Sequence, residues 1–151
     1  MDDLRELYQS VILDHNKRPR NFREIADAPQ SADGHNPLCG DKLTVYLALD
    51  EDDRVSDVAF LGEGCAISTA SASLMTEFVR GKSRSEVDEA FGRFHGLVTS
   101  KTDKEVDRDQ LGKLAVFSGV REYPMRVKCA SLAWHTLKAA LEDTGEVAKT
   151  E

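Results

Sequence analysis

The chain lacks an apolar run that could cross a membrane, because none of its segments approaches the roughly 20 residues that a spanning helix needs. Its first residues, Met1-Asp2-Asp3, are acidic and do not resemble a secretory signal. Basic residues are also in deficit: 20 Lys and Arg stand against 27 Asp and Glu, giving a net charge of −7. A surface of this sign repels phosphate backbones on average. We therefore expect a cytoplasmic protein that binds neither membranes nor nucleic acid.

Cysteine is scarce, with three residues at positions 39, 65 and 129. An odd count without a secretory signal argues against a disulfide framework. The 151 residues, of which 40% are hydrophobic and 31% charged, fit one domain with a core large enough to need no cross-link. We expect that domain to span residues 1–151.

The first half of the chain predicts a helix followed by a β-hairpin. The helix starts after Asp2 and Asp3, ends near residues 17–19, and carries one apolar stripe: Leu4, Leu7, Tyr8, Val11 and Ile12. Alternating apolar residues predict strands over 43–49 and 55–61, joined by a charged turn and broken at residues 62–64. Residues 21–37 are polar and predict a loop, with at most a short edge strand that Pro29 and Gly34 make doubtful.

The second half predicts mostly helices. One begins at Cys65, and a second follows a capping box formed by Ser83 and Glu86. An exposed, charged connection over 99–110 leads to a short helical stretch at 111–120 and to a last helix over 126–142, with Cys129 in its first turn. Together these elements predict an α+β fold, in which a small antiparallel sheet is covered by helices on one face.

All three cysteines fall at the ends of predicted elements, where side chains converge on a surface. Helix N-termini favour thiolates, and Arg126 and Lys128 place two cations near the third cysteine. These positions indicate a soft-metal site or a reactive thiol, whereas inert buried thiols remain the alternative. Asp41 follows Cys39 after one glycine. Three thiolates and one carboxylate would complete a tetrahedral zinc site, although Asp41 could instead be a turn or capping residue.

Three segments resemble the signature segments of the IscU/NifU-like family: NPLCGD at 36–41, GEGCAIS at 62–68 and YPMRVKC at 123–129. The stretch 8–19 resembles the first helix of that family, so the similarity covers the chain to about residue 141. Two features resemble the SufU branch. Lys128 stands where IscU-type scaffolds carry histidine, and the segment between the second and third cysteines is long.

The resemblance implies an IscU/SufU-like fold and a zinc-dependent sulfurtransferase in iron–sulfur cluster assembly. Such a protein would accept persulfide sulfur from a SufS-type cysteine desulfurase and serve downstream assembly proteins. It would hold one zinc ion per chain, with Cys39 as the sulfur acceptor and Arg126 and Lys128 as supporting charges. The ligands carried over are Cys39, Asp41, Cys65 and Cys129.

Two other functions remain open at this point. One is an IscU-like scaffold on which an iron–sulfur cluster is assembled, since thiolates also suit iron and sulfide. The other is a zinc-stabilised binding module without thiol chemistry. His35, four residues before Cys39, is either a spare ligand or a solvent-exposed residue of a polar loop.

Overall fold

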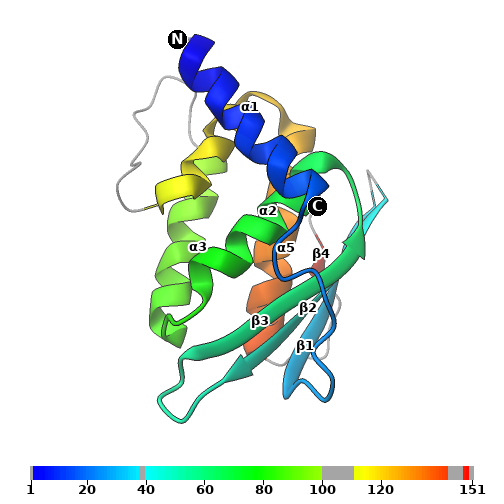
Figure 1. The fold of residues 1–151 in the computed structure, drawn as a ribbon, viewed down its shortest axis with the longest axis vertical. Coiled ribbons are helices and arrows are strands. Elements are labelled where there is room, and N and C mark those ends of the chain that lie inside the picture. Colours follow the sequence, from blue (N-terminus) through cyan, green and yellow to red (C-terminus); the bar gives the residue numbers. More distant parts are fainter. Residues whose placement is uncertain (1, 38–39, 100–110, 143–147, 150–151) are drawn as a thin grey trace.

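The computed structural model describes residues 2–37, 40–99, 111–142 and 148–149 (Figure 1). Its elements follow the chain in this order: α1 (Asp2–Lys17), β1 (Gln30–Asn36), β2 (Asp41–Leu49), β3 (Val55–Glu63), α2 (Ala66–Val79), α3 (Arg84–Thr99), the 3₁₀ helix η1 (Gly112–Glu122), α5 (Pro124–Glu142) and β4 (Ala148–Lys149). The charged connection expected over 99–110 lies almost wholly outside the described residues. No helix in the described part of the chain is both long and apolar enough to cross a membrane.

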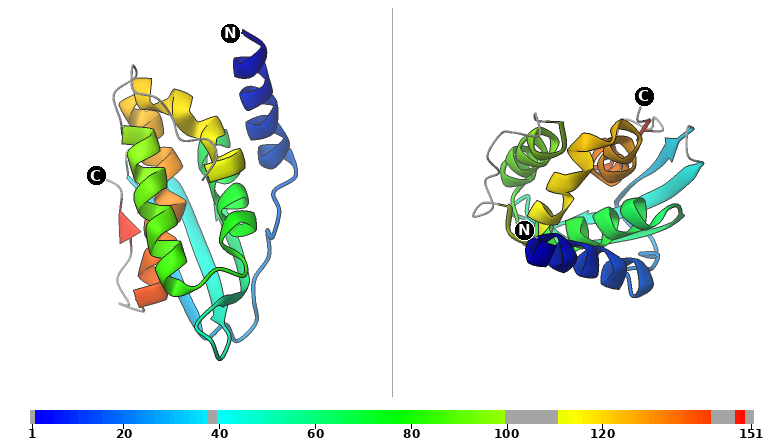
Figure 2. Two further views of the ribbon diagram at one scale, coloured as in Figure 1. Left: turned by 90° about the vertical axis from the view of Figure 1, so that its left-hand side faces the viewer. Right: turned by 90° about the horizontal axis from the view of Figure 1, so that it is seen from above.

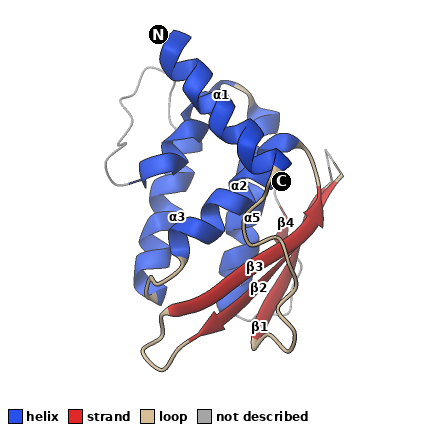
Figure 3. Cartoon of the chain, viewed as in Figure 1, coloured by secondary structure: helices blue, strands red, loops and turns tan. Residues whose placement is uncertain are grey.

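The strands form one sheet in the order β3-β2-β1-β4, with β1–β2 and β2–β3 antiparallel and the two-residue β4 parallel to β1. Helix α5 packs on β1 and β2, and α2 packs on β3. Figures 2 and 3 show the helices gathered on one side of the strands. Along β2 the side chains of Leu43, Val45 and Leu47 are buried, in the alternation that the sequence predicted. The expected α+β fold, with one sheet face covered, is confirmed.

The loop expected over residues 21–37 is the main error in the sequence-based fold. Residues 30–36 form a full strand that pairs with β2 along its length, and Pro29 lies just before it. Gly34, which seemed to weaken the strand, lies where α5 approaches the sheet. A Cβ atom at this position would overlap the Thr136 hydroxyl. The glycine therefore permits close helix–sheet packing and does not interrupt the strand.

Smaller corrections concern where elements begin and end. Helix α5 starts at Pro124, two residues earlier than predicted, because proline suits the first helical position. Cys129 consequently lies in the second turn and not in the first. Strand β3 continues through Gly62 to Glu63, and the stretch before α5 is a 3₁₀ helix. The capping box is confirmed: Ser83 N–H donates to Glu86 Oε1 at 3.0 Å, and Glu86 N–H donates to Ser83 Oγ at 3.2 Å.

Candidate metal centre

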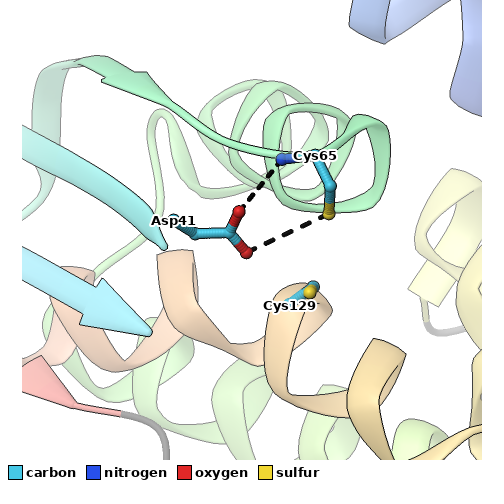
Figure 4. Close-up of side chains that lie close together, drawn as sticks. All are labelled: Asp41, Cys65 and Cys129. Carbon is cyan, nitrogen blue, oxygen red and sulfur yellow. Dashed lines mark hydrogen bonds between the residues drawn. The ribbon is translucent and has the colours of Figure 1, made fainter. Parts of the chain in front are cut away.

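Three side chains from three separate elements lie close together (Figure 4). Asp41 is the first residue of β2, Cys65 is the N-cap residue of α2, and Cys129 lies in α5. One potential ligand atom from each lies within 4.8 Å of the others. In the described part of the chain, no other group of three or more His, Cys, Asp or Glu residues is this compact.

The packing of α2 against α5 brings the two cysteines together. Ser71, fully buried on α2, donates its hydroxyl hydrogen to the carbonyl oxygen of Ala130 at 2.6 Å. Ala130 directly follows Cys129, so this hydrogen bond fixes Cys129 relative to the helix that Cys65 caps. Small residues dominate the buried face of α2 and allow the helices to approach closely.

Asp41 is oriented by the backbone around Cys65. Its carboxylate is 1% exposed, and Oδ1 accepts the Cys65 N–H at 3.0 Å, which leaves Oδ2 facing the sulfur atoms. Oδ2 lies 4.0 Å from Cys65 Sγ. Gly64 makes this arrangement possible, because a Cβ atom there would lie 2.8 Å from Oδ1. Asp41 therefore places one oxygen against a helix N-terminus and the other in the cluster.

The Cys65 thiol is acidic in this setting. Its sulfur accepts the N–H of Ser68 at 3.4 Å, in the first turn of α2. The pKa of Cys65 is lowered to about 6, chiefly by a hydrogen bond with Cys129 and further by the N–H groups of Ser68 and Ile67. Burial and the negative charge of Asp41 act in the opposite direction. Cys65 lies at the surface, so this thiolate is accessible.

Cys129 is the buried member of the cluster, at 3% exposure. The amide nitrogen Nδ2 of Asn36 lies 3.8 Å from its sulfur. Asn36 is the last residue of β1, pairs with Asp41 across the hairpin and is fully buried. Asn36 was not among the predicted site residues. The signal that could have found it was its place as the first residue of the NPLCGD segment.

Cys39, the remaining ligand implied by the resemblance, lies outside the described residues. Its neighbour Gly40 has a left-handed backbone, with φ +74°, a conformation that glycine adopts without strain. The Gly40 N–H donates to the Asn36 carbonyl at 2.9 Å. Asn36, the last residue of β1, and Asp41, the first residue of β2, therefore flank in the sequence the segment that contains Cys39.

The other candidate residues are His35, Arg126 and Lys128. His35 lies on a strand and not on a loop, between the buried Gly34 and Asn36, so alternation directs its side chain to the opposite face of the sheet. It is not part of the cluster in the described residues. Arg126 is exposed and its guanidinium group lies 4.6 Å from the centre of the Tyr123 ring. The electrostatic role of Arg126 and Lys128 stays a prediction.

The chemistry of this donor set fits a zinc ion. Zinc is a borderline-soft cation that accepts both soft thiolates and harder carboxylate oxygens in tetrahedral sites, and a fourth ligand would complete the shell. Thiolates also suit iron and sulfide, so the donors alone do not select between the two. Zinc, iron–sulfur chemistry and thiol reactivity are all compatible with this geometry.

Comparisons with known proteins bear on that choice. Residues 7–130 match the model of the NifU-like N-terminal domain. The chain is 39% identical over 137 residues to the zinc-dependent sulfurtransferase SufU of Bacillus subtilis, covering 90% of each chain. It is 37% identical over 142 residues to the iron–sulfur cluster assembly scaffold protein IscU of Streptococcus pyogenes serotype M1, covering 94% of this chain and 87% of that one.

A solved structure shares the fold as well. The crystal structure from Fervidobacterium islandicum AW-1, described as an iron–sulfur cluster assembly scaffold protein for the SUF system, superposes with a TM-score of 0.79 at 39% identity. The match covers 87% of this chain and 93% of the other.

Proposed function

Because the chain belongs to the family of the NifU-like N-terminal domain, we propose that it is a zinc-dependent sulfurtransferase of the SufU type. In the coarser sense that its relatives share, the chain is an iron–sulfur cluster assembly protein of the IscU/SufU type. The proposed role is to accept persulfide sulfur on Cys39 from a SufS-type cysteine desulfurase. The sulfur then passes to downstream iron–sulfur assembly proteins.

The observation that carries the proposal is the convergence of Asp41, Cys65 and Cys129 within 4.8 Å. A cluster with two thiols and a carboxylate suits a stable zinc site, for which Cys39 would be the fourth ligand. Zinc would keep the thiols deprotonated and contribute folding free energy. Lys128 adds a second argument, because it stands where IscU-type scaffolds carry histidine.

The three cysteines have different roles in the proposed reaction. Cys65 is the N-cap residue of α2 and Cys129 lies within α5, whereas Cys39 falls in the sequence between the end of β1 and the start of β2. A thiolate at Cys39 attacks the terminal sulfur of the desulfurase persulfide. The S–S bond breaks, the desulfurase cysteine leaves as a thiolate, and Cys39 becomes the persulfide. No external oxidant or reductant is needed, since one S–S bond replaces another.

An IscU-like scaffold function is the second candidate, because an IscU-named relative is about as similar as the SufU-named one. The two functions differ in the metal content of the purified protein: zinc without colour for the sulfurtransferase, and iron with a brown colour for the scaffold. A zinc-stabilised module without thiol chemistry would accept no sulfur at all.

Persulfide mapping tests the proposal. The zinc-loaded protein is incubated with a SufS-type desulfurase and cysteine, alkylated, and digested for mass spectrometry. We expect an added sulfur atom on the peptide that contains Cys39. Cys39→Ala should still bind the desulfurase but carry no persulfide, whereas His35→Ala, a control on the opposite face of the sheet, should accept sulfur normally. Persulfide found mainly on Cys129, or on no cysteine, contradicts the assignment.

A further inference from the structure

Each of the three residues of the cluster has an N–H group close to one of its side-chain oxygen or sulfur atoms. The Cys65 N–H donates to Asp41 Oδ1 at 3.0 Å, and the Ser68 N–H donates to Cys65 Sγ at 3.4 Å. Cys129 Sγ lies 3.8 Å from Nδ2 of Asn36. The first two donors belong to the main chain, whereas the third is a side chain. Of these three contacts, only the one from Asn36 can be removed by a single substitution of the donor.

The position of Asn36 makes its carboxamide unusual. The residue is 0% exposed, and it lies on the same face of β1 as the buried Gly34, directed toward the helices. Burying a carboxamide is costly unless its polar atoms make hydrogen bonds. An apolar residue of equal size, such as leucine, would fill this space without that cost. The amide group itself is therefore the feature to be explained.

The sulfur of Cys129 has a particular need for a donor. Cys65 lies at the surface, where water can solvate its charge, but Cys129 is 3% exposed. With both thiols and Asp41 ionised, the described ligands carry a charge of −3, more than one divalent cation neutralises. A polar N–H group beside the buried sulfur takes over part of the role that water plays at the surface.

We propose that Asn36 is a positioning residue of the metal centre, whose N–H···S hydrogen bond withdraws charge from the Cys129 thiolate and thereby sets the strength of its bond to the metal. This inference rests on the proposed zinc site. Partners behind metal ligands fix the orientation and basicity of those ligands, and their loss typically costs about 10–100-fold in metal affinity. The main chain of Asn36 is held as well, because its carbonyl accepts the Gly40 N–H at 2.9 Å.

Cobalt substitution tests the inference without measuring sulfur transfer. Co²⁺ replaces zinc in thiolate sites and shows sulfur-to-metal charge-transfer bands in the near ultraviolet and ligand-field bands in the visible. Removing a hydrogen bond raises the energy of the sulfur lone pairs. In Asn36→Leu we expect the charge-transfer band to move to longer wavelength, the ligand-field bands to keep their tetrahedral pattern, and the Co²⁺ affinity to fall about ten-fold or more. Asn16→Leu, the same change at a half-buried position of α1, should leave the charge-transfer band, the ligand-field bands and the Co²⁺ affinity unchanged.

The outcomes separate this inference from the proposed function. Wild-type protein that binds no Co²⁺ overturns both. Wild-type protein that binds Co²⁺ while Asn36→Leu leaves the charge-transfer band in place overturns the role of Asn36 alone, and so does a changed ligand-field pattern, which would mean that Asn36 only supports the local structure.

A measurement on the wild-type protein covers the case in which Asn36→Leu does not fold. In protein loaded with ¹¹³Cd, nuclear magnetic resonance should detect scalar coupling between the metal and an Asn36 side-chain amide proton, transmitted through the Cys129 sulfur. Coupling at this amide supports the hydrogen bond. The proposal is overturned if this coupling is absent in a sample that does show coupling between the metal and the main-chain N–H groups that hydrogen-bond the other ligands.

Discussion

Replacing Gly64 by alanine should weaken the metal centre while leaving the fold in place. Gly64 has no left-handed backbone that alanine would resist. The new Cβ atom would lie 2.8 Å from Asp41 Oδ1 and 3.2 Å from its Cγ, and ordinary contact begins at 3.4 Å. The carboxylate must therefore retreat by about 0.6 Å, whereas metal–ligand distances tolerate about 0.2 Å. We expect metal affinity to fall by about ten-fold or more.

The metal-free protein should also lose stability. The retreat of Asp41 breaks the hydrogen bond from the Cys65 N–H, and a bond to a charged acceptor contributes about 1.5–3 kcal/mol. Alanine also restricts the unfolded chain more than glycine does, and this lower entropy of the unfolded state stabilises the protein by about 0.4–1 kcal/mol. The net loss of about 1.5 kcal/mol lowers Tm by about 3–6 °C for a domain of this size. Chelator competition and calorimetry measure the two effects separately.

Gly92→Ala is the matched control. Gly92 lies in α3, and a Cβ atom there would meet nothing within 4 Å. Because glycine weakens a helix interior by about 0.5–1 kcal/mol relative to alanine, this variant should melt higher and bind metal normally. Equal metal affinity and Tm in Gly64→Ala and the wild type would refute the reasoning about Asp41.

Three further predictions follow from the structure. Cys65→Ser and Cys129→Ser should each lose most of the bound zinc and melt lower than the zinc-loaded wild type, as metal analysis and calorimetry would show; unchanged values would contradict the ligand assignment. His15 is 2% exposed, and burial, assisted by the nearby Arg20 charge, lowers its pKa. The unfolded chain therefore binds more protons, so the free energy of unfolding should decrease as pH falls below about 6.5, and His15→Gln should flatten that dependence in denaturant titrations at several pH values. Ser83→Ala removes the cap of α3 and should cost about 1 kcal/mol without affecting metal binding; a larger loss, or a loss of metal, would show that the box does more than cap the helix.

Local patterns explain why most of the fold could be predicted. The stripe of α1, the alternation along β2 and the capping box of α3 are each encoded within a few neighbouring residues. Strand β1 could not be predicted in this way. Glycine locally disfavours a strand, so Gly34 argued against one. The reason for a glycine at this position is its contact with Thr136, about 100 residues later in the chain. Tertiary contacts override local preference at that position.

The candidate ligands were predicted from residue types and resemblance, and their role as metal ligands stays a prediction. Asp41, Cys65 and Cys129 come together as expected, while Cys39 lies outside the described residues. The place of Asn36 in the NPLCGD segment marks it as a candidate, but nothing in the spacing shows that a carboxamide 93 residues from Cys129 reaches its sulfur. Burial and distance supply that information, and only the folded chain contains it.

Native mass spectrometry of the purified protein tests the central claim most directly, because one spectrum reports the metal, its stoichiometry and any bound sulfide. The account predicts a single added mass of one zinc ion per chain in a colourless sample, with that mass lost in Cys65→Ser. A wild-type chain that carries iron and sulfide, or no metal after expression with zinc supplied, would contradict it.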